Sequence, residues 1–174
     1  MVGGLTGPSR SFLCEPRGAV WDGAGNLYIT DMGNRRVLLY NSPLTTDTLP
    51  DKVFGKPDFV TGHDPNIPNI CPSPTAAILC NPFGVALDSA GNLWVSDTFY
   101  SRVLRYDSPL TSDTIADAVF GQPNMTSSGC NNGGMSESSL CSPLDLEFDA
   151  TGNLFVSDNG NNRILAYSAS PLNA

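Results

Sequence analysis

The chain has few charged residues, and those that favour helices most are the scarcest. Only 15 % of its 174 residues are charged, against about a quarter in an ordinary soluble domain. It holds two lysines and three glutamates, whereas glycine (17) and proline (14) are plentiful. This balance argues against a mainly helical protein and predicts many short strands joined by turns.

Positive charge is lacking too, because the net charge is −8 and no basic run occurs anywhere. Binding to nucleic acid or to an anionic membrane needs Lys and Arg to neutralise phosphates, so we expect neither partner. No apolar run approaches the ~20 residues of a membrane span. Residues 1–4 have neither the basic start nor the apolar run of a signal peptide.

The five cysteines are accompanied by a single histidine and no CxxC motif, which argues against zinc. Cys71 and Cys80 flank one stretch rich in small and polar residues, and Cys130 and Cys141 flank another. Disulfides Cys71–Cys80 and Cys130–Cys141 are therefore expected, each contributing about 2–3 kcal/mol. The alternative is a cytosolic protein with five reduced thiols. Cys14 is left as an unpaired or inter-chain cysteine.

One segment recurs three times along the chain. Residues 14–59 match residues 80–125 without a gap, with about half the positions identical, and a third copy begins at Cys141. The shared core reads GAVWDGAGNLYITDMGNRRVLLYNSPL at 18–44, GVALDSAGNLWVSDTFYSRVLRYDSPL at 84–110 and DLEFDATGNLFVSDNGNNRILAYSASPL at 145–172.

Each copy divides into strands by its pattern. The expected first strands are 18–22, 84–88 and 144–149, and the second strands are 27–30, 93–96 and 154–157. A D-x-x-G-N turn joins them, because Asp bonds back into the turn and Gly accepts a positive φ. RVLLY, RVLRY and RILAY form third strands, and KVFG (52–55) and AVFG (118–121) form fourth strands. Four antiparallel strands in series predict a propeller blade.

The motif D-x-x-G-N-[LI]-[YWF]-[VI]-x-D-x-x-x-x-R-[VI]-x-x-Y resembles the NHL repeat, over about 27 residues in each copy. That family forms β-propellers, and its long, cysteine-containing repeats are found in secreted or cell-surface proteins. The resemblance implies an all-β fold of three NHL-type blades, a partial or half propeller. We expect the blades at about 14–59, 80–125 and 141–174, the third of them incomplete, with cysteine loops at 60–79 and 126–140.

Three blades are too few to close a ring, because natural propellers have about four to eight. Apolar blade faces would then be exposed at both ends. Two alternatives stay open: a fragment of a longer propeller, or a half-ring that another copy completes with two-fold symmetry. Copies that add head to tail without closing would form a fibre. The expected partner is therefore the chain itself or the missing blades.

The turn between the second and third strands is the first candidate for a ligand site. It lies at the same end of a blade as the cysteine loops, which is the usual ligand face of such folds. In the second copy it contains Phe99 and Tyr100, a candidate patch for a glycan or a peptide. The alternative is that these rings pack against the neighbouring cysteine loop.

A polar position near the propeller axis is the second candidate. Glu147 stands in a first strand where the other copies have Val20 and Ala86, and Asp145 lies two residues before it. Carboxylates that gather near the axis would suit calcium, which prefers oxygen ligands. The D-x-x-G-N turn itself lacks the ligand spacing and the final Glu of an EF-hand.

An Asp and an Arg five residues later recur in every copy: Asp31 and Arg36, Asp97 and Arg102, Asp158 and Arg163. A residue that recurs at fixed spacing is usually architectural, so we expect Asp to cap the turn and Arg to pair with it or with the next blade. Ligand binding by these residues is the alternative. Asn124 begins an Asn-Met-Thr sequon and is a candidate glycosylation site.

Catalytic groups are hard to assemble from this sequence. The amidating lyases resemble the chain in fold, but their zinc site needs several histidines, and one histidine also prevents a confident Ser–His–Asp arrangement. The sequence therefore predicts a non-catalytic extracellular or cell-surface module for binding or assembly, without a cofactor. The alternative is half of a propeller enzyme, a lactonase-like hydrolase with a central metal.

Overall fold

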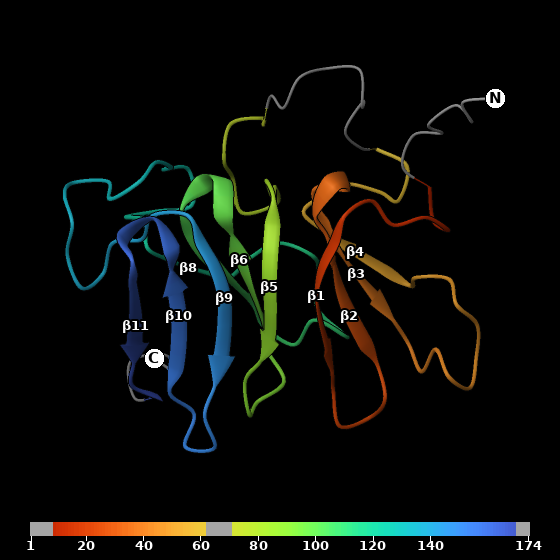
Figure 1. Cartoon of the computed structure of the whole chain (residues 1–174). Coiled ribbons are helices and arrows are strands. Elements are labelled where there is room, and N and C mark those ends of the chain that lie inside the picture. Colours follow the sequence, from red (N-terminus) through yellow and green to blue (C-terminus); the bar gives the residue numbers. More distant parts are fainter. Residues whose placement is uncertain (1–8, 62–70, 170–174) are drawn as a thin grey trace.

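The computed structural model describes residues 9–61 and 71–169, and these fold as three antiparallel sheets (Figure 1). Blade 1 has the strands β1 (Pro16–Trp21), β2 (Leu27–Asp31), β3 (Arg36–Tyr40) and β4 (Lys52–Phe54). Blade 2 has β5 (Pro82–Leu87), β6 (Leu93–Asp97), β7 (Arg102–Tyr106) and β8 (Ala118–Phe120). Blade 3 has β9 (Pro143–Phe148), β10 (Leu154–Asp158) and β11 (Arg163–Tyr167). The prediction of an all-β fold with four-stranded antiparallel blades is confirmed for the first two sheets, and the third has three strands within the described residues.

Short 3-10 helices join the second and third strands: η1 (Met32–Asn34), η2 (Thr98–Tyr100) and η3 (Asn159–Asn161). No helix in the two described ranges is long and apolar enough to cross a membrane.

The strand limits differ slightly from those expected, for two physical reasons. Each first strand begins at a proline, which pairs across a bulge with the aspartate that ends the second strand. Each fourth strand ends at its phenylalanine, because the following Gly55 and Gly121 have φ of +82° and +85°, outside the extended region.

The blades stand side by side, with β1, β5 and β9 adjacent at the centre (Figure 1). The D-x-x-G-N turns lie at the lower end in this view. The 3-10 helices and the cysteine-containing loops lie at the upper end. The central strands and the upper rim are therefore two places where side chains from different blades come together.

Two apolar layers join neighbouring blades. Between blades 1 and 2, Tyr28 and Phe54 pack against Tyr106, and all three are fully buried or nearly so. Between blades 2 and 3, Trp94 is fully buried and its ring lies 5.4 Å from that of Phe148. A fully buried large apolar side chain contributes about 1.5–3 kcal/mol, so these layers supply most of the favourable free energy of folding.

A hydroxyl group links the central strands of neighbouring blades. Thr30 Oγ1 accepts a hydrogen bond from Gly18 N (2.6 Å) and donates one to the Phe83 carbonyl of blade 2 (2.8 Å). Ser96 Oγ does the same between Gly84 N and the Leu144 carbonyl of blade 3. The strands approach so closely that a Cβ on Gly84 would lie 2.7 Å from that carbonyl oxygen, which explains the glycine.

The D-x-x-G-N turn is built as the sequence predicts. Asp149 Oδ1 accepts hydrogen bonds from the backbone N–H groups of Asn153 and Thr151, both 2.9 Å, and from the Thr151 hydroxyl at 2.8 Å. Its Oδ2 accepts one from the Asn153 amide. Asp22 makes the equivalent contacts with Ala24 and Asn26. These donors favour the ionised carboxylate and lower the pKa of Asp149 from 3.8 to about 2.

We predict that the carboxylate of Asp149 titrates with a midpoint about 2, measured by NMR of the side-chain carbonyl carbon. Because the folded pKa lies below the unfolded value, the stabilisation by this turn is fully present above pH 4 and is lost as the pH falls through 2. A midpoint near 3.8 would mean that the four donors do not hold this carboxylate in solution.

Candidate functional site

The upper rim of each blade is organised around a buried ion pair. Arg36 Nε donates to Asp31 Oδ2 at 2.6 Å, and Arg102 Nε donates to Asp97 Oδ2 at 2.8 Å, with all four side chains 0 % exposed. In blade 3 the Arg163–Asp158 distance is 2.7 Å, and the Arg163 side chain is 26 % exposed. We call these three contacts the Asp–Arg pairs.

In each Asp–Arg pair the aspartate also makes a contact outside its own turn. None of them makes a side-chain cap to its 3-10 helix. Instead Oδ1 accepts the backbone N–H of the cysteine that precedes the blade: Cys14, Cys80 or Cys141, each at 2.7 Å. Each helix is closed by a residue in the left-handed region: Arg35, Ser101 or Asn162. The aspartate therefore fixes where the cysteine loop joins the blade.

The arginines hold the loops by their main chain. Arg102 Nη2 donates to the carbonyls of Thr75 (3.1 Å) and Ile78 (2.7 Å), and Nη1 donates to that of Met125 (2.7 Å). One guanidinium thus joins the cysteine loop before blade 2, the third strand and the segment after the fourth strand. Arg36 binds the carbonyls of Ser9, Phe12 and Phe59 in the same way.

Burial has a cost for the carboxylate of blade 2. It raises the pKa of Asp97 to about 6, although the Arg102 guanidinium and the Cys80 N–H both favour the charged form. A buried charge of this kind persists because it is paired and hydrogen-bonded on both oxygens, and removing one partner leaves the other uncompensated.

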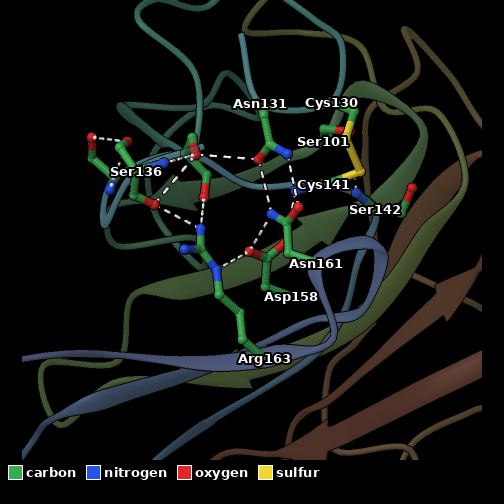
Figure 2. A network of polar contacts seen from close by, with 11 residues as sticks. Ser101, Cys130, Asn131, Ser136, Cys141, Ser142, Asp158, Asn161 and Arg163 are labelled. Atoms are coloured by element: carbon green, nitrogen blue, oxygen red, sulfur yellow. Dashed lines mark hydrogen bonds and ion pairs between the residues drawn. A yellow bond between two sulfur atoms is a disulfide. The ribbon is translucent and has the colours of Figure 1, made fainter. Parts of the chain in front are cut away.

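Blade 3 adds an amide pair to this arrangement (Figure 2). Asn131 and Asn161 exchange two hydrogen bonds of 2.7 and 2.8 Å, and the Asn161 amide also donates to Asp158 at 2.7 Å. Asn131 belongs to the cysteine loop and lies beside the Cys130–Cys141 disulfide, as Figure 2 shows. The loop is thus held by a covalent bond and by side-chain amides at one place.

The structure contains the two disulfides that the spacing predicts, Cys71–Cys80 and Cys130–Cys141. Cys14 is a free, exposed cysteine. The partial burial of its thiol raises the thiol pKa, and the negative charges of the neighbouring Glu15 and Asp31 raise it further. The Cys14 sulfur faces Gly33 as the Cys141 sulfur faces Gly160, so it occupies the position that a disulfide sulfur has in blade 3.

The expected pair of exposed aromatic rings reduces to one ring. Tyr100 is 3 % exposed; its hydroxyl donates to the Pro72 carbonyl in the cysteine loop, and its ring lies 4.9 Å from the Arg102 guanidinium carbon. Phe99 is 55 % exposed and contacts Tyr100 edge-on, 5.8 Å between ring centroids. Tyr100 is therefore part of the packing of the loop, and only Phe99 is offered to a ligand.

The two carboxylates of β9 that the sequence proposes for an axial site both lie on the surface. Glu147 is exposed opposite Phe155 in the sheet, and Asp145 is exposed with Oδ1 accepting the N–H of Leu146. Across residues 9–61 and 71–169, no three His, Cys, Asp or Glu side chains gather where they could hold a metal ion. The single histidine, His63, lies outside the described residues.

Asn124 lies on the surface in the loop after β8. Its Oδ1 accepts hydrogen bonds from the N–H and the hydroxyl of Thr126, at 3.0 and 2.9 Å. Asp58 makes the equivalent turn in blade 1 by accepting the N–H of Val60 at 2.9 Å, so this geometry has a structural role whether or not a glycan is attached. Glycosylation at Asn124 stays a prediction.

Blade 3 has an exposed apolar face, which comparison with the equivalent residues of blade 2 identifies. Phe155 is 38 % and Ile164 64 % exposed, whereas their equivalents in blade 2, Trp94 and Val103, are fully buried by blade 3. Phe155, Ile164 and the exposed Ala166 form what we call the open face. Sequence reasoning expected such a face but did not name these residues, although the repeat alignment identifies them directly.

No protein-family model matches the chain, and no curated protein matches it either. Solved structures that are similar to it include the following two. One is a catalytically inactive variant of virginiamycin B lyase from Staphylococcus aureus with quinupristin, 15 % identical, with a TM-score of 0.54, covering 90 % of this chain and 39 % of that one. The other is a protein of unknown function from Bacteroides thetaiotaomicron, 17 % identical, with a TM-score of 0.55, covering 82 % of this chain and 32 % of that one.

The fold is that of a β-propeller. At these identities the likeness shows the fold alone, and the chain spans 39 % and 32 % of the two propellers. The resemblance to NHL repeats is not tested by these matches and stays a prediction.

We predict that Asp97→Asn lowers the free energy of unfolding by about 3–5 kcal/mol, because it leaves the Arg102 guanidinium buried without a counter-charge. The control is Arg17→Ala, which removes the exposed pair with Glu15 (3.7 Å) and costs less than about 1 kcal/mol. Denaturant unfolding at pH 7.5 measures both. Equal, small losses for the two variants would show that the Asp–Arg pair does not hold the rim together.

Proposed function

We propose that this chain is a non-catalytic extracellular module for binding and assembly, and that it associates with a second copy through the open face of blade 3. Two disulfides are typical of an oxidising, extracellular-type environment and support that location. The polar residues that recur in the repeat are engaged in holding loops, which supports an architectural rather than a chemical role for them.

The observation that carries the proposal is the exposure of Ile164. Its equivalents Val37 and Val103 are 0 % exposed because the next blade covers them, and Ile164 is 64 % exposed. An apolar blade face of this kind is normally covered by another blade, because exposure of contiguous apolar surface disfavours an isolated state.

A second copy fits this face by residue type and by charge. In the existing interface, Leu93 and Val95 of blade 2 meet Tyr28 of blade 1, and the half-buried Leu27 and Ile29 are their equivalents on the first blade of another copy. These residues would meet Phe155 and Ile164 of the open face.

Charge favours the same orientation. Asp145 is the blade 3 equivalent of Gly84, which closely approaches Leu144 and Asp145 of the next blade. In a second copy the residue equivalent to Leu144 is Arg17. Opposite charges would thus meet at the central strand. The side chain of Asp145 needs more room than glycine, so a second copy would sit slightly further away at this point.

The proposal is tested by sedimentation equilibrium across micromolar to millimolar concentrations. We expect the wild-type mass to rise with concentration, and Ile164→Asp to weaken association at least about tenfold, because it buries a charge in the interface. Ile115→Asp is the matched control, since Ile115 is 43 % exposed on a loop away from the open face. A wild-type chain that stays monomeric throughout, or equal weakening by the control, would contradict the proposal.

A hydrolase with a metal on the axis is the alternative that the sequence leaves open. No observation among the described residues favours it, so it is not proposed. Two side chains on β9, Asp145 and Glu147, are the residues that such a site would have to use.

A further inference from the structure

The outer edge of β11 has the position that a fourth strand occupies in the other two blades. In those blades β4 and β8 add to the third strand in one register, with Val37 opposite Phe54 and Val103 opposite Phe120. Within the described ranges β11 pairs only with β10, so its second edge offers main-chain groups to a further strand (Figure 1).

A hollow of about 270 Å³ lies beside this position, lined by Phe120, Gly121, Gln122 and Tyr167 together with serines of the cysteine loop. At the equivalent place between blades 1 and 2, Ala116 is buried in the same cluster as Phe54 and Tyr106. The N–H of Ala116 donates to the Ala76 carbonyl at 3.0 Å. The residues just before β8 thus fill the space that is open beside blade 3.

Arg163 points to the same position independently. Nη1 of Arg36 donates to the Phe59 carbonyl (2.5 Å) and Nη1 of Arg102 to that of Met125 (2.7 Å), in each case five residues after the phenylalanine of the fourth strand. Arg163 uses Nε and Nη2 as the other arginines do, but no carbonyl of the described residues reaches its Nη1. The side chain of Arg163 is correspondingly the one of the three that is partly exposed.

We propose that the edge of β11, the hollow and Arg163 Nη1 together form a binding site for one extended Ala-Val-Phe-Gly segment of a partner polypeptide. By the register of blade 2, the phenylalanine of this segment lies opposite Ile164 and its valine opposite Leu165. The fifth residue after the phenylalanine offers its carbonyl to Arg163. The inference rests on the proposed function only in that the module binds polypeptides.

The chemistry of the site is that of strand addition. Main-chain hydrogen bonds give affinity, and alternate side chains in pockets give specificity. In blade 2 the Arg105 carbonyl accepts the Asp117 N–H at 2.8 Å, and in blade 1 the Leu39 carbonyl accepts that of Asp51 at 2.8 Å. Ala166 is the equivalent residue of β11, so its carbonyl and N–H face the incoming strand.

The experiment uses a synthetic peptide with the sequence of residues 114–126, which contains the β8 strand, and measures binding to the whole chain by fluorescence anisotropy. We expect saturable binding by the wild type and by Ala166→Ser. Ala166→Pro removes the outward N–H and blocks strand addition, while proline is tolerated on an edge strand; we expect at least tenfold weaker binding. Arg163→Lys keeps a positive charge beside Asp158 but removes Nη1, and we expect several-fold weaker binding.

A second peptide, with Val119→Asp and Phe120→Asp, keeps the test valid should the proline variant not fold; we expect it not to bind. Absence of saturable binding of the first peptide, or equal affinity of both peptides, would overturn the inference. Peptide binding by a chain that remains monomeric would refute the self-association proposal alone. Self-association without peptide binding would refute the strand site and leave the assembly proposal standing.

Discussion

The buried Asp–Arg pair is the interaction on which the rest of the structure depends. Its aspartate is the last residue of the second strand, and its arginine is the first residue of the third. The aspartate also fixes the cysteine that precedes the blade, through a 2.7 Å hydrogen bond from the N–H of Cys80 to Asp97 in blade 2. The arginine then gathers carbonyls from loops more than twenty residues away in either direction. Such a pair is costly to bury, so its value lies in fixing one arrangement of loops that contain little other regular structure.

Repetition explains both what the sequence could predict and what it could not. The D-x-x-G-N turns, the strand order and the two disulfides follow from local patterns that recur, and each is determined by neighbouring residues. The hydrogen bond from the N–H of Cys80 to Asp97 was not predicted, because Cys80 lies seventeen residues away and no local pattern reports that contact. Packing of Tyr100 against the cysteine loop is one of the two alternatives that the sequence left open, and the hydrogen bond from its hydroxyl to the Pro72 carbonyl decides for it.

The hydroxyl links between blades were not predicted either, although a signal was present. Thr30 and Ser96 are small hydroxyl residues at equivalent positions in strands that are otherwise apolar, and each bridges to a carbonyl of the next blade. Ser157 is the third member of this series, on the blade whose open face exposes Ile164.

The central claim is that the Asp–Arg pairs unite loops and blades into one cooperative structure, and native-state hydrogen exchange tests it most directly. The amide N–H of Cys80, which donates to the buried Asp97, lies in a loop and would exchange quickly if the loop moved on its own. The account predicts that it exchanges only with global unfolding, with the same denaturant dependence as the amides of β6. Exchange of Cys80 at the rate of exposed loop amides such as Thr126, while β6 stays protected, would contradict it.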